Sequence, residues 1–177
     1  MQTCSFFGHR DFVETEEKTL KLKGIVEHLI ANGVDTFLFG SRSKFNDFCY
    51  KIVSDLKEKY SHIRRIFYTC VHERATLQSD REKLKKYCST YGIDFEKICY
   101  EEEVHFCGRV KAGKGAYVER NQAMIDASDY CVFYYDENYL PKMRKYSKTS
   151  LATYQPNSGT KLALDYAKRL HKQIIFL

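Results

Sequence analysis

The sequence has 177 residues, of which 44% are hydrophobic and 29% charged, with only nine glycines and two prolines. This composition supplies the apolar core of one domain and excludes a disordered, collagen-like or low-complexity chain. A net charge of +6, from 29 basic and 23 acidic residues, favours anionic ligands without identifying one.

Short apolar runs alternate with amphipathic stretches along the chain. In the first half we predict a strand at residues 3–7, a helix at 15–31, a strand at 36–39, a helix at 45–59 and a strand at 63–70. In the second half we predict a helix at 77–90, a strand at 95–100, a helix at 115–127 and a strand at 130–135. The last predicted elements are a helix that follows residues 157–160 and ends near His171, and a strand at 173–177. Strands that alternate with helices indicate an α/β fold with a mostly parallel sheet and helices on both faces.

Residues 136–155 differ from the rest in composition, because basic side chains and tyrosines replace the apolar periodicity. We predict a loop or lid inserted into a single domain that spans residues 1–177. Tyr139, Tyr146 and Tyr154 between positive residues are also compatible with bases of a single-stranded nucleic acid stacking on them. A solvated charged loop has the same composition, and the remaining charge is mixed, so nucleic acid is not the expected partner.

Seven cysteines, an odd number, are scattered along the chain, and several lie in apolar runs. We therefore expect buried thiols in a reducing cytosol rather than disulfides. His105, Cys107 and Cys99 have no CxxC spacing, so no metal site is expected. The absence of a signal region and of a bilayer-length apolar run predicts a cytoplasmic protein without membrane contact.

Three glycine-bearing turns follow predicted strands or precede a predicted helix. In an open parallel sheet, ligands bind beyond the carboxyl ends of the strands, and glycine lets the backbone amides of a helix start approach a phosphate. Thr160 adds a hydroxyl, and Arg10 and Arg42 add charged donors. The predicted phosphate-binding turns are Gly8-His9-Arg10, Gly40-Ser41-Arg42 and Ser158-Gly159-Thr160.

Two further side chains are candidates for the site, each with a structural alternative. His9 lies beside the first turn and either contacts the ligand as a proton donor or packs locally against backbone. Arg120 either faces the ligand or pairs with Glu119 or another acid on a solvated helix face. The pattern leaves both alternatives open.

Several short motifs occur together in one order: CSFFGHR at residues 4–10, FLFG at 37–40, ERNQAM at 119–124, SDYC at 128–131 and SGT at 158–160. Together they resemble the YpsA-like branch of the SLOG superfamily, which also contains the LONELY GUY phosphoribohydrolases and the DNA-processing protein A Rossmann domain. The resemblance implies a Rossmann-like, doubly wound fold and a site for nucleotides or nucleotide-derived ligands. It also implies that Arg120 matches the arginine that the related enzymes carry in a Glu-Arg-Lys-type helix.

The chain departs from the enzymes of that superfamily in two places. Gly159 and Thr160 match their PGGxGTxxE segment, but Ala163 stands at the position of the glutamate. Alanine neither stabilises an oxocarbenium ion nor activates water, and Asp165 lies about 200° further around the helix. Lys44 replaces a glycine and either blocks part of the pocket or contacts a phosphate.

The primary hypothesis is a module that binds or senses a nucleotide-like small molecule, with an NAD- or ADP-ribose-related ligand as one option. One alternative is an N-glycosidase acting on nucleoside monophosphates, with Arg120 and His9 as candidate catalytic residues, and another is single-stranded nucleic-acid binding. No cofactor is expected. A homodimer is compatible with such a fold, although no residue in the sequence specifies one.

Overall fold

Six parallel strands form the central sheet of the protein. The structure, a computed structural model, describes residues 2–40, 43–70, 82–83, 85–92, 103–107 and 115–177. The strand order is β4-β3-β2-β1-β5-β8, and each neighbouring pair is parallel. The strands are β1 (Gln2–Gly8), β2 (Val34–Gly40), β3 (Arg64–Thr69), β4 (Glu103–Phe106), β5 (Tyr130–Tyr134) and β8 (Gln173–Phe176). The predicted Rossmann-like, doubly wound α/β fold is thereby confirmed.

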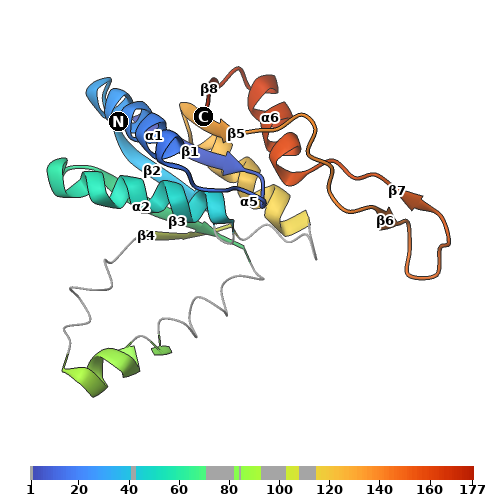
Figure 1. The fold of residues 1–177 in the computed structure, drawn as a ribbon, viewed down its shortest axis with the longest axis horizontal. Coiled ribbons are helices and arrows are strands. Elements are labelled where there is room, and N and C mark those ends of the chain that lie inside the picture. Colours follow the sequence, from blue (N-terminus) through green and yellow to red (C-terminus); the bar gives the residue numbers. More distant parts are fainter. Residues whose placement is uncertain (1, 41–42, 71–81, 84, 93–102, 108–114) are drawn as a thin grey trace.

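Helices cover both faces of this sheet (Figure 1). They are α1 (Glu16–Ala31), α2 (Lys44–Lys59), α5 (Gly115–Asp126) and α6 (Gly159–Arg169), and residues 82–83 and 85–91 are also helical. Side-chain oxygens of Thr15, Ser43 and Ser158 cap the first turns of α1, α2 and α6. After α1, Gly33 adopts φ +91°, a conformation that favours glycine and ends the helix.

Two apolar cores lie on opposite faces of the sheet because successive strand residues point to alternate sides. On one face, Phe6 and Phe39 pack with α1 and α2. On the other face, Phe7 and Phe133 pack with α5 and α6. Ring pairs tie neighbouring strands together within each core, with ring centroids 5.3 Å apart for Phe6–Phe39 and 5.1 Å apart for Phe7–Phe133.

The predicted buried thiols are found at Cys4, Cys49 and Cys131, which lie in these cores without disulfides. Burial raises the pKa of the Cys131 thiol to about 11. The thiol therefore stays protonated near neutral pH and packs as a small apolar group.

The chain reverses its winding direction between β1 and β5. From β1 it passes through α1 to β2 and through α2 to β3, whereas β5 pairs with the opposite side of β1, in register from Cys4–Tyr130 to Gly8–Tyr134. The carboxyl ends of β1 and β5 therefore flank a topological switch point, the place where open α/β sheets bind ligands.

Most predicted elements agree with the structure to within three residues at their ends. Larger differences between prediction and structure occur at the edge of the sheet and in residues 136–155. The predicted strand at residues 95–100 and part of the helix at 77–90 lie outside the described residues. The structure adds the edge strand β4, which the sequence did not predict. No helix in the described ranges is long and apolar enough to cross a bilayer.

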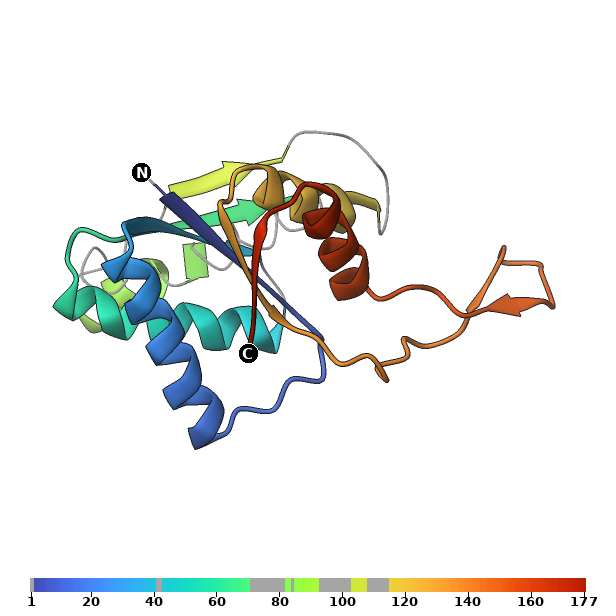
Figure 2. The same cartoon turned by 90° about the horizontal axis from the view of Figure 1, so that it is seen from above.

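Residues 136–155, named the arm below, leave the sheet after β5 and return before α6. Instead of an irregular loop, the arm contains a two-stranded antiparallel hairpin of β6 (Arg144–Lys145) and β7 (Thr153–Tyr154). Figure 2 shows the hairpin extending away from the sheet and its helices. The predicted role as a lid stays a prediction.

Candidate functional site

Three predicted site segments meet at the carboxyl edge of the sheet. Gly8 ends β1, Gly40 ends β2, and Ser158 caps the start of α6. Because all six strands are parallel and the helices run back against them, strand ends and helix starts share this edge (Figures 1 and 2). Ser41 and Arg42, the other predicted residues of the second turn, lie outside the described residues.

His9 is the buried polar side chain at the switch point. It is 3% exposed, and its ring stacks on Tyr139 at 4.1 Å between centroids and lies 5.4 Å from Tyr135. Neither ring nitrogen meets the distance and angle of a hydrogen bond with a described residue, although the backbone of Asp136 lies near enough to the ring to raise its pKa. A buried polar group without a hydrogen bond costs about 1–3 kcal/mol, so a ligand that bonds to this ring would recover free energy.

The surroundings of His9 favour its neutral form. Burial lowers the pKa of His9 below its usual value of 6.5, and the backbone of Asp136 and the carboxylates of Asp136 and Asp11 offset this only in part. The neutral imidazole presents one donor and one acceptor nitrogen, which suits a neutral hydrogen-bonding group as well as an anion.

Because the pKa of His9 is lower in the folded chain than in the unfolded chain, acidification is expected to destabilise the protein. The unfolded ring takes up a proton as the pH falls below 6.5, whereas the folded ring does so only at lower pH. The free energy of unfolding, measured by urea titration, should therefore fall as the pH drops through the unfolded pKa of 6.5, and His9→Phe should flatten the slope. Equal slopes for wild type and His9→Phe would contradict this assignment.

Gly8 has a packing role that the sequence did not predict. A Cβ built on Gly8 would lie 2.4 Å from two ring atoms of Phe45 and 2.7 Å from its Cβ. Phe45 is the second residue of α2 and is fully buried, so its ring occupies the space that a side chain at the end of β1 would need. The glycine here lets a helix start close onto the sheet, and its predicted contact with a phosphate stays a prediction.

Arg120 reaches the carboxyl edge from α5. Its side chain is 6% exposed, and a Cβ on Gly40 would lie 3.0 Å from both Cζ and Nη2. Nη2 donates to Oδ1 of Asn121 at 3.0 Å, and Cζ lies 5.5 Å from the ring centroid of Tyr117. The alternative of a solvated helix face is therefore wrong for Arg120, because its guanidinium is buried against the end of β2.

The start of α6 offers backbone amides at this edge. Ser158 Oγ accepts from the Lys161 amide at 3.0 Å, so this hydroxyl already serves as the helix cap. Gly159 is exposed, with nothing within 4 Å of a Cβ built on it, and Thr160 is buried in the first turn. Arg10, from the first predicted turn, is exposed. A helix start of this kind attracts anions through its amides and its dipole.

The position of the phosphoribohydrolase glutamate lies in the apolar core. Ala163 is 3% exposed and packs between α6 and the sheet. Asp165 lies on the outer side, where its carboxylate pairs with Lys161 at 3.5 Å and is 52% exposed. Neither residue therefore supplies a carboxylate to the carboxyl edge, in agreement with the helical spacing.

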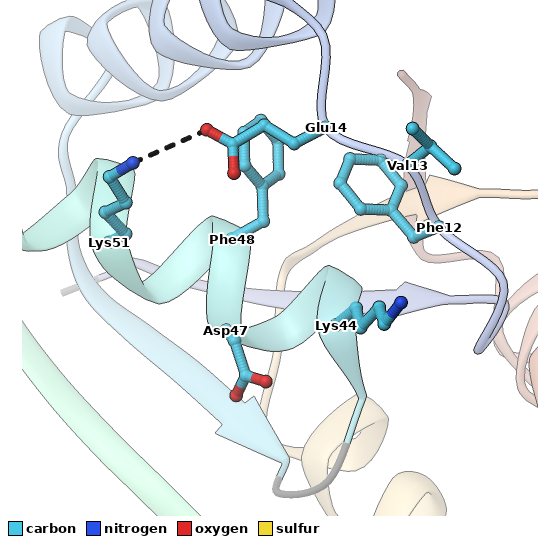
Figure 3. A pocket seen from close by; sticks show the side chains of 7 residues that line it. All are labelled: Phe12, Val13, Glu14, Lys44, Asp47, Phe48 and Lys51. Carbon is cyan, nitrogen blue, oxygen red and sulfur yellow. Dashed lines mark hydrogen bonds and ion pairs between the residues drawn. The ribbon is translucent and has the colours of Figure 1, made fainter.

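A surface pocket of about 420 Å³ lies between the segment that leads to α1 and the first turns of α2 (Figure 3). Its lining is Phe12, Val13, Glu14, Lys44, Asp47, Phe48 and Lys51. Glu14 and Lys51 form an ion pair across it at 3.4 Å, and burial raises the pKa of Asp47. Of this group, only Lys44 was a candidate from the sequence. The helical spacing of Lys44, Phe48 and Lys51 on one face of α2 is the signal from which more of the lining could have been predicted.

The described ranges hold no group of three His, Cys, Asp or Glu side chains arranged to bind a metal. Of the three residues considered for zinc, Cys99 lies outside those ranges. His105 is exposed and its ring lies 4.5 Å from that of Tyr68, whereas Cys107 is buried.

The doubly wound sheet and the motifs at residues 37–40, 119–124, 128–131 and 158–160 agree with a comparison against protein families. Residues 10–167 match the family model YpsA, described as the YspA SLOG family. The chain belongs to this SLOG family. The match covers most of the sheet, α1, α2, α5 and nearly all of α6, so the YpsA-like resemblance of the sequence motifs is confirmed.

A comparison with curated proteins finds a short local similarity. The SLOG protein is 35% identical over 57 residues to the glutamine–fructose-6-phosphate aminotransferase (isomerizing) of Methanocaldococcus jannaschii. These residues are 32% of this chain and 5% of that protein, so the SLOG protein corresponds to a small part of its relative's length. The similarity therefore does not carry the activity of a whole enzyme.

Proposed function

We propose that this SLOG protein binds a nucleotide or nucleotide-derived small molecule at the carboxyl edge of its sheet. The observation that carries the proposal is His9, a buried imidazole at the topological switch point whose ring nitrogens reach no hydrogen-bond geometry with a described residue. The family suggests ligands of the same class.

The charges at this edge support an anionic group on the ligand. The phosphate rests on the first-turn amides of α6 at Gly159 and Thr160, where an exposed glycine leaves room for close approach. The guanidinium of Arg120 supplies a fixed positive charge near the end of β2. Because burial favours the neutral form of His9, its ring contacts an uncharged part of the ligand that can form hydrogen bonds.

Binding without hydrolysis fits the residues of α6 better than an N-glycosidase activity. The equivalent of the enzyme glutamate is the buried Ala163, and the nearest carboxylate on α6, Asp165, faces outward. An assay for free base released from nucleoside monophosphates separates the two functions, and base release above the buffer blank would contradict a purely binding role.

The proposal is tested first by a thermal-shift screen with AMP, ADP-ribose, NAD and cyclic nucleotides. A ligand at about 100 times its dissociation constant stabilises a protein by about 2.7 kcal/mol. At roughly 2–4 °C per kcal/mol for a chain of this size, the melting temperature should rise by about 5–10 °C. A panel that produces no shift would contradict the proposed ligand class.

The placement of the phosphate is tested at Gly159. Gly159→Asp puts a carboxylate at the start of α6, where an acidic side chain favours the helix and meets no neighbouring atom within 4 Å of its Cβ. We expect unchanged or higher stability together with at least about tenfold weaker binding of the ligand from the screen, by calorimetry. Gly159→Asn is the neutral control of matched size and should retain most of the affinity. Equal affinities of Gly159→Asp and Gly159→Asn would contradict the placement of the phosphate at the start of α6.

A further inference from the structure

The arm exposes apolar side chains that no described part of the same chain covers. Leu140 is 72% exposed, Met143 57%, Tyr146 72% and Leu151 95%. Single exposed apolar residues are common on protein surfaces, but several together on one projecting hairpin indicate a contact surface. In both views the arm extends away from α1 and α2 (Figures 1 and 2).

Internal contacts hold the arm in one shape. Arg144 pairs with Tyr154 and Lys145 with Thr153 across the hairpin, and the rings of Tyr146 and Tyr154 lie 4.9 Å apart. Gln155 Nε2 donates to the carbonyl of Pro141 at 2.6 Å and so joins the two ends of the hairpin. A hairpin already ordered in this way loses less conformational entropy when a partner binds.

From residue 140 onward, the charge of the arm is of one sign, whereas its first two residues are Asp136 and Glu137. Residues 140–155 contain no acidic side chain and four basic ones, Lys142, Arg144, Lys145 and Lys148. Any partner surface must therefore combine negative charge with an apolar area that accepts leucine and methionine side chains.

The same chain carries a surface with these properties at the start of α1, named the acidic segment and comprising residues 11–20. It exposes four carboxylates, on Asp11, Glu14, Glu16 and Glu17. Val13 and Leu20 are each 65% exposed between and beside them. The pocket of about 420 Å³ opens next to Val13 and Glu14, and its lining includes the rings of Phe12 and Phe48 (Figure 3).

We propose that the arm of one copy docks on the acidic segment of a second copy, and that two such contacts form a two-fold dimer. The two surfaces are opposite in charge, because residues 140–155 carry four basic side chains and the acidic segment carries four carboxylates with Lys18, a net charge of −3. Lys44 and Lys51 line the adjoining pocket, and Lys51 pairs with Glu14 there, so the other three carboxylates are the ones that face the arm. Each surface also offers aliphatic groups to the other. A two-fold axis makes the contact reciprocal, because the arm of each copy meets the acidic segment of its partner. An apolar side chain of the arm enters the pocket beside Val13.

Single-stranded nucleic acid is the competing partner for a basic hairpin with tyrosines. The aliphatic side chains decide between the two, because Leu140, Met143 and Leu151 offer neither a stacking face nor a phosphate contact. A protein surface accepts them, and the acidic segment supplies both the charge and the apolar area.

The test is a charge-exchange experiment on the full chain, followed by analytical ultracentrifugation over a range of concentrations. Wild type should be a dimer that dissociates on dilution and at high salt. The arm variant Lys142→Glu/Lys145→Glu/Lys148→Glu should be monomeric, and so should the acidic-segment variant Glu14→Lys/Glu16→Lys/Glu17→Lys. Mixing the two variants should restore the dimer, since each arm then meets a surface of opposite charge.

A second variant tests the apolar part of the contact. Leu151→Ser should raise the dimer dissociation constant by about tenfold or more without a change in net charge. Thr149→Ser, on the same hairpin, is the matched control and should leave the constant unchanged. The arm variants should melt alike, because their substituted side chains are exposed. The acidic-segment variant should melt at a lower temperature, since it puts lysines in the first turn of α1 and breaks the Glu14–Lys51 ion pair, so circular dichroism must show that it is folded under the conditions of the mixing experiment.

Two results would overturn the proposal. One is a wild type that stays monomeric at every concentration. The other is a mixture of the two charge variants that fails to associate. Tight, salt-dependent binding of a fluorescent oligothymidine by a monomeric wild type, lost in the arm variant, would assign the arm to nucleic acid instead.

Discussion

Gly8→Ala is expected to destabilise the protein by about 2 kcal/mol or more, although alanine adds only one methyl group. The new Cβ would lie 2.4 Å from ring atoms of Phe45, closer than side chains approach one another in folded proteins. Phe45 is fully buried against Phe12 and Tyr134, with ring centroids 5.2 and 5.9 Å away, so its ring has little room to move. Urea or thermal denaturation measures the loss.

A glycine in α1 provides the matched control for this substitution. Gly24 lies in the middle of the helix with nothing within 4 Å of a Cβ, so Gly24→Ala should stabilise the protein by about 0.5–1 kcal/mol. Phe45→Ala removes the Cγ and Cδ1 atoms that lie 2.4 Å from the new Cβ, so Gly8→Ala should cost less stability in a Phe45→Ala background than in the wild type. A Gly8→Ala protein as stable as wild type would contradict the close approach of α2 to β1.

Arg120→Met should weaken binding of the ligand found in the thermal-shift screen by about 10–100-fold, as measured by calorimetry. A hydrogen bond to a charged group contributes about 1.5–3 kcal/mol, and tenfold in affinity corresponds to about 1.4 kcal/mol. Methionine keeps the length of the side chain and suits a site where Arg120 is 6% exposed, so the fold should persist.

Two further variants test whether binding depends on the position of the Arg120 guanidinium or only on the net positive charge of the protein. Arg169→Met removes the same charge from the exposed end of α6, at the opposite edge of the sheet, and should leave the affinity unchanged. Gly40→Ala keeps the charge but places a Cβ 3.0 Å from the guanidinium Cζ of Arg120, so it should displace that group and weaken binding. Full affinity in Arg120→Met would remove Arg120 from the site.

The strands and helices of the sheet were predictable because their apolar residues are spaced as the two cores require. Phe6 and Phe7, one residue apart on β1, face opposite cores, which is the pattern of a strand covered on both faces. The predicted helix starts lie at residues that the structure shows to be caps, Thr15 and Ser158, whose side-chain oxygens accept from first-turn amides.

The short strands were harder to predict, because residue preferences do not determine them. β4 extends over only Glu103–Phe106 and forms by pairing with β3, in register from Ile66–Glu103 to Thr69–Phe106. The two-residue strands of the arm likewise depend on each other. Such pairings come from contacts between distant residues, and a local pattern of apolar residues does not report them.

The candidate site was predictable to the extent that topology determines it. Parallel strands bring their carboxyl ends to one edge, so Gly8, Gly40 and the start of α6 were expected together. The burial of His9 between Tyr135 and Tyr139 could not be predicted, because Tyr139 lies 130 residues further along the chain, in the arm. Nor does the sequence reveal that the ring of Phe45 fills the space above Gly8.

The division of the two cores along the chain has a consequence for the order of folding. Within the described residues, the core under α1 and α2 is built from residues 4–63 with Val132, so most of it is complete once the first βαβαβ unit has been synthesised. The core under α5 and α6 needs Phe7 and Leu38 to meet residues between Cys107 and Ala167, and β1 to pair with β5 across more than 120 residues. Contacts over such separations form slowly. On the ribosome, one side of β1 therefore has its partner strand early, and the other side waits for the second half of the chain.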